Sequence, residues 1–180
     1  MTEPTTYDDL DLKGYIRDIP NFPKEGIIFK DITPLLQDKK AFAKSIDLLA
    51  NRFQDKNIDT IVGVDARGFI FASALAYKLG VGFVPVRKKG KLPYKTKSVT
   101  YELEYGTDTL EMHEDAVSSN SRVLIVDDLL ATGGTIKAVS DLVKGQGAEI
   151  VGIAFLIELG FLNGRDKLKD FEIYSLINYS

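Results

Sequence analysis

Hydrophobic and polar positions follow two patterns along the chain, and these patterns predict strands and helices in turn. Short runs of β-branched and other apolar residues are typical of strands buried on both faces of a sheet. Such runs lie within residues 59–64, 82–86, 122–126, 149–157 and 171–177. Apolar residues at helical spacing, or clusters of small residues, predict helices over residues 38–54, 68–79 and 136–144. Strands that alternate with helices predict an α/β fold with a mainly parallel central sheet and flanking helices on both faces.

Two stretches fall outside this alternation. Residues 7–19 carry apolar side chains at rough helical spacing, which predicts an entry helix, and residues 20–34 contain three prolines, which predicts a structured loop. Residues from about 92 to 113 form an insertion that is too long for an ordinary connection. Its polar and apolar residues alternate on both sides of Gly106, so we expect a flexible hairpin. Long insertions of this kind commonly act as lids over a ligand site.

Length, charge and cysteine content narrow the class of protein. The 180 residues are enough for a single domain with a substantial core, and 44% of them are hydrophobic. The net charge of −3 does not favour nucleic acid or an anionic membrane as a partner. The absence of cysteine excludes a disulfide framework and a thiol nucleophile. Because no signal peptide or membrane-spanning run is recognisable, we expect a cytoplasmic protein.

Residues 123–135 carry the strongest indication of chemistry. Four apolar residues precede two acids, Asp127 and Asp128, and a short apolar bridge follows. The next five residues have the composition of a phosphate-binding loop: Ala131, Thr132, Gly133, Gly134 and Thr135. Free amides at a helix N-terminus bind anions, and glycines let the backbone approach closely. Acids often cap helices, but two adjacent carboxylates after an apolar strand suit the vicinal hydroxyls of a sugar. The stretch therefore predicts a site for ribose 5-phosphate.

This stretch resembles the signature for phosphoribosyl pyrophosphate (PRPP) of the type I phosphoribosyltransferases. A Walker-type phosphate loop is excluded because no Gly-Lys-Ser/Thr follows the glycines. The resemblance implies the type I phosphoribosyltransferase fold, with an N-terminal hood at about residues 15–36 and the lid hairpin at about residues 92–113. It also implies Mg²⁺ as the cofactor, held mainly by PRPP and not by a set of protein ligands.

Further segments are similar to the adenine phosphoribosyltransferases within this family: Phe22–Pro34, Asp65–Phe69, Val86–Pro93 and Tyr101–Gly106. Members that use 6-oxopurines typically carry an acid where this chain has Ala131, so alanine favours adenine. The resemblance implies that adenine and PRPP are converted to AMP and pyrophosphate, a reaction of purine salvage. It also implies a homodimer. From the resemblance together with the net charge, we expect no nucleic-acid or membrane partner.

Two basic segments are candidates for the pyrophosphate of PRPP. Asp65, Ala66 and Arg67 end one strand and open a helix, and an arginine there offers a planar fork of donors. The resemblance implies a cis peptide in this turn, with backbone N–H directed at pyrophosphate. The second segment follows the strand at residues 82–86, and we expect it to contact pyrophosphate through Arg87, Lys88 and Lys91. In the family, the residue at the position of Arg87 can reach into the neighbouring site of a dimer.

The resemblance implies that adenine is bound by residues that composition alone would place in the hydrophobic core. It implies backbone contacts to adenine from Ile28 and Lys30, stacking by Phe29, and packing by Leu159 on the other side of the base. Glu104, near the tip of the hairpin, is the candidate catalytic residue, because a closed lid would bring its carboxylate to purine N7. The alternative is that Glu104 only solvates the hairpin.

Two other functions remain open at this stage. A regulator built on the same fold would bind PRPP as a signal and attach to nucleic acid, which requires an additional DNA-binding segment or a basic face. The net negative charge and the lack of spare length argue against it. An enzyme of the same fold for xanthine or another base is the second alternative, and the residues do not exclude side activity on other bases.

Overall fold

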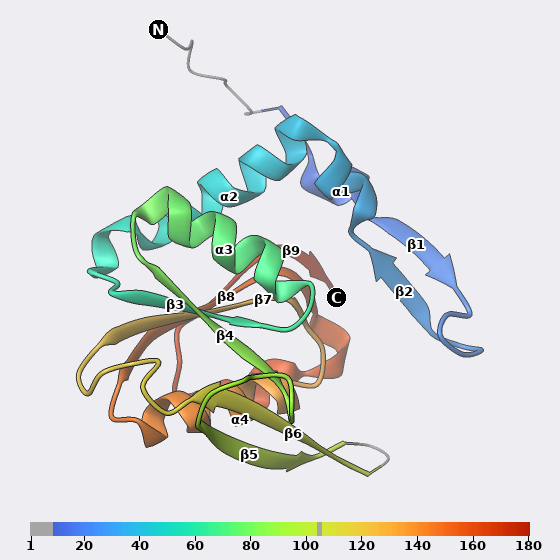
Figure 1. The fold of residues 1–180 in the computed structure, drawn as a ribbon. Coiled ribbons are helices and arrows are strands. Elements are labelled where there is room, and N and C mark those ends of the chain that lie inside the picture. Colours follow the sequence, from blue (N-terminus) through green and yellow to red (C-terminus); the bar gives the residue numbers. More distant parts are fainter. Residues whose placement is uncertain (1–8, 104–105) are drawn as a thin grey trace, which may run out of the picture. The chain divides into compact units, whose positions relative to one another are not determined.

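The computed structural model describes residues 9–103 and 106–180, and its ribbon is drawn in Figure 1. The chain forms two compact units, Met1–Leu48 and Leu49–Ser180, each described by itself. The predicted hood falls inside the first unit and the predicted lid hairpin inside the second. Within the described residues, no helix combines the length and the apolar character needed to cross a membrane.

The first unit contains a β-hairpin followed by helices. Its elements are the 3₁₀ turn η1 (Leu12–Tyr15), strands β1 (Arg17–Pro20) and β2 (Ile28–Asp31), helix α1 (Thr33–Gln37) and the beginning of helix α2 (Lys39–Phe53). The two strands pair antiparallel. The prediction of an entry helix over residues 7–19 was wrong, because the described part of this stretch has only one 3₁₀ turn before β1. Gly14 disfavours a longer helix, and the extended backbone after Tyr15 pairs with β2.

The predicted loop over residues 20–34 was wrong in part. Its second half forms β2 and the start of α1, and Pro34 stands in the first turn of that helix, where a missing N–H is tolerated. Helix α2 agrees with the predicted range of residues 38–54 within one residue at each end.

The second unit is built on a seven-stranded sheet with the order β5-β6-β4-β3-β7-β8-β9. Its five parallel strands are β3 (Thr60–Val64), β4 (Gly82–Lys88), β7 (Arg122–Leu130), β8 (Glu149–Leu159) and β9 (Ile173–Tyr179). An antiparallel pair, β5 (Thr96–Glu102) and β6 (Thr107–His113), extends the β4 edge. The mainly parallel sheet is confirmed, and so is the hairpin pairing within the insertion.

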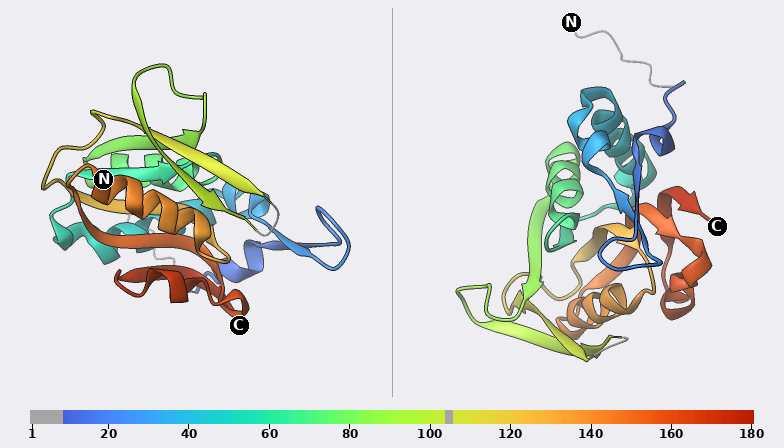
Figure 2. Two further views of the ribbon diagram at one scale, coloured as in Figure 1. Left: turned by 90° about the horizontal axis from the view of Figure 1, so that it is seen from below. Right: turned by 90° about the vertical axis from the view of Figure 1, so that its right-hand side faces the viewer.

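Helices cover both faces of this sheet. Figures 1 and 2 show α3 (Gly68–Leu79) on one face and α4 (Gly134–Gly145) on the other. Three further 3₁₀ segments complete the unit: η2 (Gln54–Lys56), η3 (Gly160–Leu162) and η4 (Gly164–Leu168). The central strands are buried on both sides, and residues 123–126 of β7 have no exposed surface. This burial explains the unbroken apolar runs of the sequence.

Three strands are longer than the sequence predicts. β4 runs to Lys88, although a strand ending at residue 86 was expected, so Arg87 and Lys88 belong to the strand and do not follow it. β7 continues through the two acids to Leu130, although a strand ending at residue 126 was expected. Its pairing with β3 ends at Val126, while its pairing with β8 continues to Leu130. One remaining neighbour is sufficient to keep the polar residues extended. β8 likewise runs to Leu159, which is the last residue of the strand and does not follow it.

Candidate active site

The phosphate loop joins the carboxyl end of β7 to the N-terminus of α4. Gly133 is the N-cap of α4 and has a φ of +80°, a conformation that glycine adopts without strain. Because glycine has no side chain to cap the helix, the amides of the first turn remain available to an anion. A Cβ at Gly133 would lie 2.4 Å from the carbonyl oxygen of Gly164, so the loop packs directly on the backbone of η4. The loop from Ala131 to Thr135 therefore has the build of a phosphate cradle.

The two acids precede this loop on β7. Asp128 is buried and Asp127 is partly buried. The backbone N–H of Asp128 donates to Oδ1 of Asp127 over 2.8 Å, and Nη2 of Arg67 lies 2.8 Å from Oδ2 of Asp128. Burial raises the pKa of both carboxyls; the charge of Asp128 raises the pKa of Asp127 further, whereas Arg67 counteracts the rise at Asp128. Carboxyl groups with shifted pKa values beside a helix N-terminus are typical of a functional site.

The turn after β3 meets these acids. The Asp65–Ala66 peptide is cis, as the resemblance to the family implies. Gly68, the first residue of α3, packs so closely on β7 that a Cβ would lie 2.6 Å from Oδ1 of Asp127. Arg67 and Asp127 are thus held at the same edge of the sheet by neighbouring strands.

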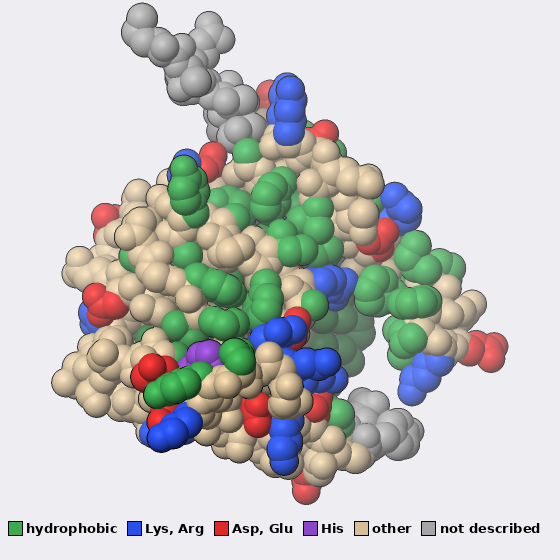
Figure 3. All heavy atoms as spheres, viewed as in Figure 1, with side chains coloured by type: hydrophobic (Ala, Val, Ile, Leu, Met, Phe, Trp, Pro, Cys, Tyr) green, Lys and Arg blue, Asp and Glu red, His purple; other side chains and the backbone are tan. Residues whose placement is uncertain are grey.

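The second basic segment is tied to the same turn. Nε of Arg87 donates to Oδ2 of Asp65 over 2.9 Å, and Nη1 of Arg87 donates to the carbonyl oxygen of Lys91 over 3.3 Å. Lys88 is exposed and forms an ion pair of 3.1 Å with Asp108 of β6. The hydrogen bond that Lys88 donates to the Asp108 carboxylate, together with the negative charge of that group, raises the pKa of Lys88. Figure 3 shows basic and acidic side chains gathered over the end of β4 and the adjoining hairpin. The structure thus brings Arg87 to Asp65, two residues before Arg67 in the chain.

The predicted adenine residues Ile28, Phe29 and Lys30 lie on β2, in the first unit. Phe29 meets the ring of Phe22 edge to face, with 5.2 Å between the ring centroids. Ile28 is exposed, whereas Lys30 is buried and its Nζ donates to Oδ1 of Asp18 over 2.6 Å. Leu159 is half-buried at the end of β8, in the second unit.

The register of this hairpin decides where the backbone groups of β2 point. Pro20 is opposite Ile28, and proline has no N–H, so this pair does not exchange hydrogen bonds. Ile19 and Phe29 must then be the hydrogen-bonded pair. It follows that Ile28 and Lys30 direct their N–H and C=O groups away from β1, toward the open edge of the hairpin.

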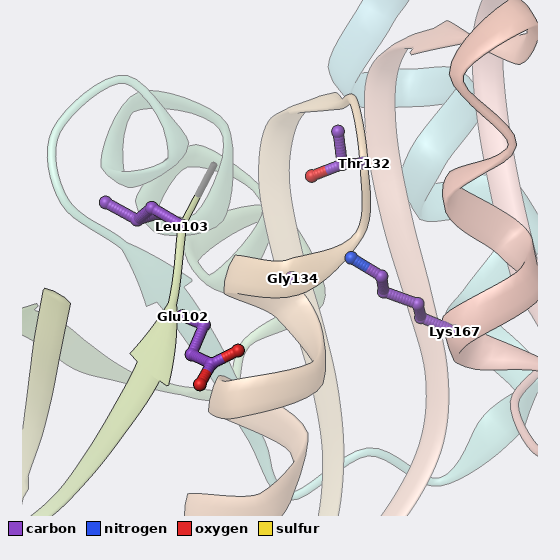
Figure 4. A pocket seen from close by; sticks show the side chains of 5 residues that line it. All are labelled: Glu102, Leu103, Thr132, Gly134 and Lys167. Atoms are coloured by element: carbon purple, nitrogen blue, oxygen red, sulfur yellow. The ribbon is translucent and has the colours of Figure 1, made fainter. Parts of the chain in front are cut away.

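A cavity of about 500 Å³ lies next to the phosphate loop and is lined by Glu102, Leu103, Thr132, Gly134 and Lys167 (Figure 4). Two residues near it were not predicted from the sequence. Tyr101 of β5 places its hydroxyl oxygen 3.3 Å from Oγ1 of Thr135, and Lys167 comes from η4. The sequence signals for Tyr101 were the alternating pattern of residues 98–103 and the resemblance of the Tyr101–Gly106 segment to the family, and neither indicated this contact. Glu104 lies outside the described residues, so its role stays a prediction.

No metal-binding cluster is present in the part of the chain that the structure describes: no three acidic, histidine or cysteine side chains come together. Mg²⁺ binds substrate phosphates through few protein ligands and retains several waters. Asp127 and Asp128, at the carboxyl end of β7, offer the hard oxygen donors that Mg²⁺ accepts, so the residues present fit this ion.

Comparisons with known proteins agree with this geometry. The model of the phosphoribosyl transferase domain matches residues 31–178. A protein of Solidesulfovibrio magneticus named adenine phosphoribosyltransferase is 61% identical over 168 residues, which cover 93% of this chain and 98% of the relative.

Two solved structures are similar in fold as well as in sequence. Adenine phosphoribosyltransferase from Thermoanaerobacter pseudethanolicus has a TM-score of 0.91 and 58% identity, and the match covers 93% of this chain and 98% of that one. The enzyme from Saccharomyces cerevisiae, solved with an imino-altritol bisphosphate and adenine, has a TM-score of 0.87 and 45% identity, with 92% and 96% covered. The fold, the loop after β7 and these likenesses together show that the chain belongs to the adenine phosphoribosyltransferases of the phosphoribosyl transferase family.

Proposed function

We propose that this protein transfers the phosphoribosyl group of PRPP to adenine, forming AMP and pyrophosphate in purine salvage. The observation that carries the proposal is the order of groups along β7 and α4. Two carboxylates near the end of a parallel strand are followed, after a short apolar bridge and the phosphate loop, by a helix N-terminus without a side-chain cap. This order matches the order of groups on ribose 5-phosphate, with its vicinal hydroxyls and its terminal phosphate.

Each end of PRPP has its own partners. Backbone amides from Ala131 to Thr135 hold the 5-phosphate, and Asp127 and Asp128 hold the ribose hydroxyls. Arg67 and the basic segment, with Arg87, Lys88 and Lys91, hold pyrophosphate, together with the backbone at Asp65 and Ala66. The contact between Arg87 and Asp65, which joins the two basic segments, supports this assignment. Mg²⁺, when bound with PRPP, neutralises charge on the leaving pyrophosphate.

Adenine is bound and recognised by the hood, at about residues 15–36. The open backbone edge at Ile28 and Lys30 supplies N–H and C=O groups of the kind that recognise adenine N1 and its amino group. Phe29 offers an aromatic surface, and Leu159 packs on the other side of the base. Alanine at position 131 leaves no acid to pair with a 6-oxopurine at N7, which supports adenine as the base.

The remaining requirements of the reaction concern water and a proton. Loss of pyrophosphate from C1 develops positive charge on the sugar, and water would react with it in an open site. The insertion at about residues 92–113 serves as the lid that excludes water, and Glu104 exchanges the proton at purine N7. The protein acts as a cytoplasmic homodimer, in which Arg87 also reaches the neighbouring site.

The test is a product assay with PRPP, Mg²⁺ and each of adenine, hypoxanthine, guanine, xanthine, orotate and uracil. Adenine should be converted at least about tenfold more efficiently than any 6-oxopurine, which corresponds to about 1.4 kcal/mol in the transition state. Comparable efficiency with hypoxanthine would refute adenine specificity. Turnover of orotate or uracil without adenine would refute the proposed function itself.

A further inference from the structure

The phosphate loop has no cationic side chain of its own. Its five residues are Ala131, Thr132, Gly133, Gly134 and Thr135. A sugar phosphate carries up to two negative charges near neutral pH, and amides with hydroxyls provide only partial charges to meet them. A complete phosphate site would therefore include a cation from elsewhere in the fold.

Lys167 is the cation that the fold brings to this loop. It belongs to η4 and lines the cavity next to Thr132 and Gly134. A Cβ on Gly134 would lie 3.9 Å from Nζ of Lys167. Figure 4 shows the side chain of Lys167 extending toward the loop, with its ammonium end between Thr132 and Gly134. A phosphate on the first-turn amides of α4 would lie within reach of this ammonium group.

The segment that carries Lys167 is firmly anchored. A Cβ at Gly164 would lie 2.3 Å from the carbonyl oxygen of Ala131, so η4 and the loop are packed backbone to backbone. Arg165 donates from Nε and Nη2 to the two carboxylate oxygens of the buried Glu158, over 2.6 and 2.7 Å. Leu168 is fully buried. These contacts fix the position of η4 against the phosphate loop on both sides of Lys167.

The surroundings of Lys167 distinguish it from its neighbouring lysines. Lys169 pairs with Asp166 over 3.5 Å, and Lys137 forms an ion pair with Asp141 on α4. Among the residues that the structure describes, Lys167 forms no ion pair. The carboxylate of Glu102, on the other side of the cavity, would repel a phosphate and makes a compensating cation more important.

We infer that Lys167 binds the 5-phosphate of PRPP and AMP, and that η4 is a structural part of this subsite. The inference rests on the proposed function for the identity of the ligand. It adds to the loop a cation from a segment about thirty residues further along the chain, which no motif in the sequence indicated. Lys167 thus supplies the full positive charge that the loop lacks.

The experiment measures the binding of ribose 5-phosphate, ribose and pyrophosphate by calorimetry. In Lys167→Met, the Kd for ribose 5-phosphate should rise about tenfold or more, the usual effect of losing a hydrogen bond to a charged group. Lys167→Arg should retain affinity within about threefold, because it keeps the charge. Lys169→Met, which removes one charge from the same surface, is the matched control and should leave the Kd unchanged. The Kd for pyrophosphate should not change in any variant.

Three outcomes would overturn the inference: an unchanged Kd for ribose 5-phosphate in Lys167→Met, an equal loss of pyrophosphate affinity, or wild-type protein that binds ribose 5-phosphate no better than ribose. Urea unfolding of each variant verifies the fold, and Lys167→Gln replaces the methionine variant if that one unfolds. Because ribose 5-phosphate contains neither the base nor the leaving pyrophosphate, no reaction occurs, and the measured Kd does not depend on turnover. A wild-type protein that fails to convert adenine but passes the binding test would refute the proposed function alone.

Discussion

The hydroxyl oxygen of Tyr101 lies 3.3 Å from Oγ1 of Thr135. This contact joins β5, in the predicted lid, to the first turn of α4, in the phosphate loop. The two residues are 34 positions apart in the chain. The predicted lid and the phosphate loop are therefore in direct contact through two hydroxyl groups.

The coupling between these hydroxyls can be measured with Tyr101→Phe, Thr135→Val and the double variant. A partly buried neutral hydrogen bond contributes about 0.5–1.5 kcal/mol, so we expect a coupling energy of that size in urea unfolding. Hydrogen exchange of β5 amides should become faster in each single variant. Strictly additive free energies of unfolding would show that the contact does not couple the two elements.

The acids of β7 should be required for PRPP and dispensable for folding. Asp127→Asn and Asp128→Asn keep the shape of the side chain but remove the charge that binds ribose hydroxyls. We expect each to lower kcat/KM for PRPP by about tenfold or more, the effect of losing a charged hydrogen-bond acceptor. Asp170→Asn, an exposed change of the same kind, is the control. Full activity in both variants would refute a role of these acids in PRPP binding.

The same acids should make stability depend on pH. Burial raises the pKa of Asp127, and Asp128 raises it further. Because the folded-state pKa lies above the unfolded value of about 3.9, stability is lost as pH rises from about 4 through the folded-state pKa. Asp127→Asn lacks this loss, so its free energy of unfolding should exceed that of the wild type increasingly as pH rises. Urea titrations from pH 4 to 8 test this, and a pH-independent difference would contradict it.

Gly68 should tolerate no side chain. A Cβ there would lie 2.6 Å from Oδ1 of Asp127 and 3.3 Å from the carbonyl oxygen of Val126, so α3 or β7 must shift. We expect Gly68→Ala to cost about 1–3 kcal/mol of stability, as overpacking does, and to reduce PRPP affinity by displacing Asp127. Gly145→Ala is the matched control, because a Cβ at this exposed helical position meets nothing within 4 Å. It should be neutral or stabilising by up to about 1 kcal/mol. Equal stabilities of the two variants would refute the close packing.

Glu104 provides the test of proton transfer. Glu104→Gln keeps size and hydrogen-bonding capacity but removes the exchangeable proton. We expect a large drop in kcat with little change in KM, as for an interaction made mainly in the transition state. Single-turnover rates must accompany steady-state rates, because lid opening can limit kcat. An unchanged single-turnover rate would show that purine N7 obtains its proton elsewhere.

Local sequence was sufficient for most elements of the second unit. α3 has the predicted bounds of residues 68–79, and β3 differs by one residue. The signature from Asp127 to Thr135 was also recognisable, because a buried strand, a glycine turn and a helix start are each specified by neighbouring residues. The same holds for the turn from Asp65 to Gly68.

Features that depend on contacts between segments distant in the chain were decided only by the tertiary structure. The length of β7 depends on β8, which keeps the acids extended after β3 has ended. The N-terminal hairpin depends on pairing between β1 and β2, which overrides the weak helical spacing before it. Lys167 and Tyr101 approach the phosphate loop because η4 and β5 pack beside it. Nothing in the sequences of these two elements predicts that they contact this loop. Periodicity and turn residues record local conformation and burial, whereas the identity of the contacting segment is set only when the whole sheet and its connections pack together.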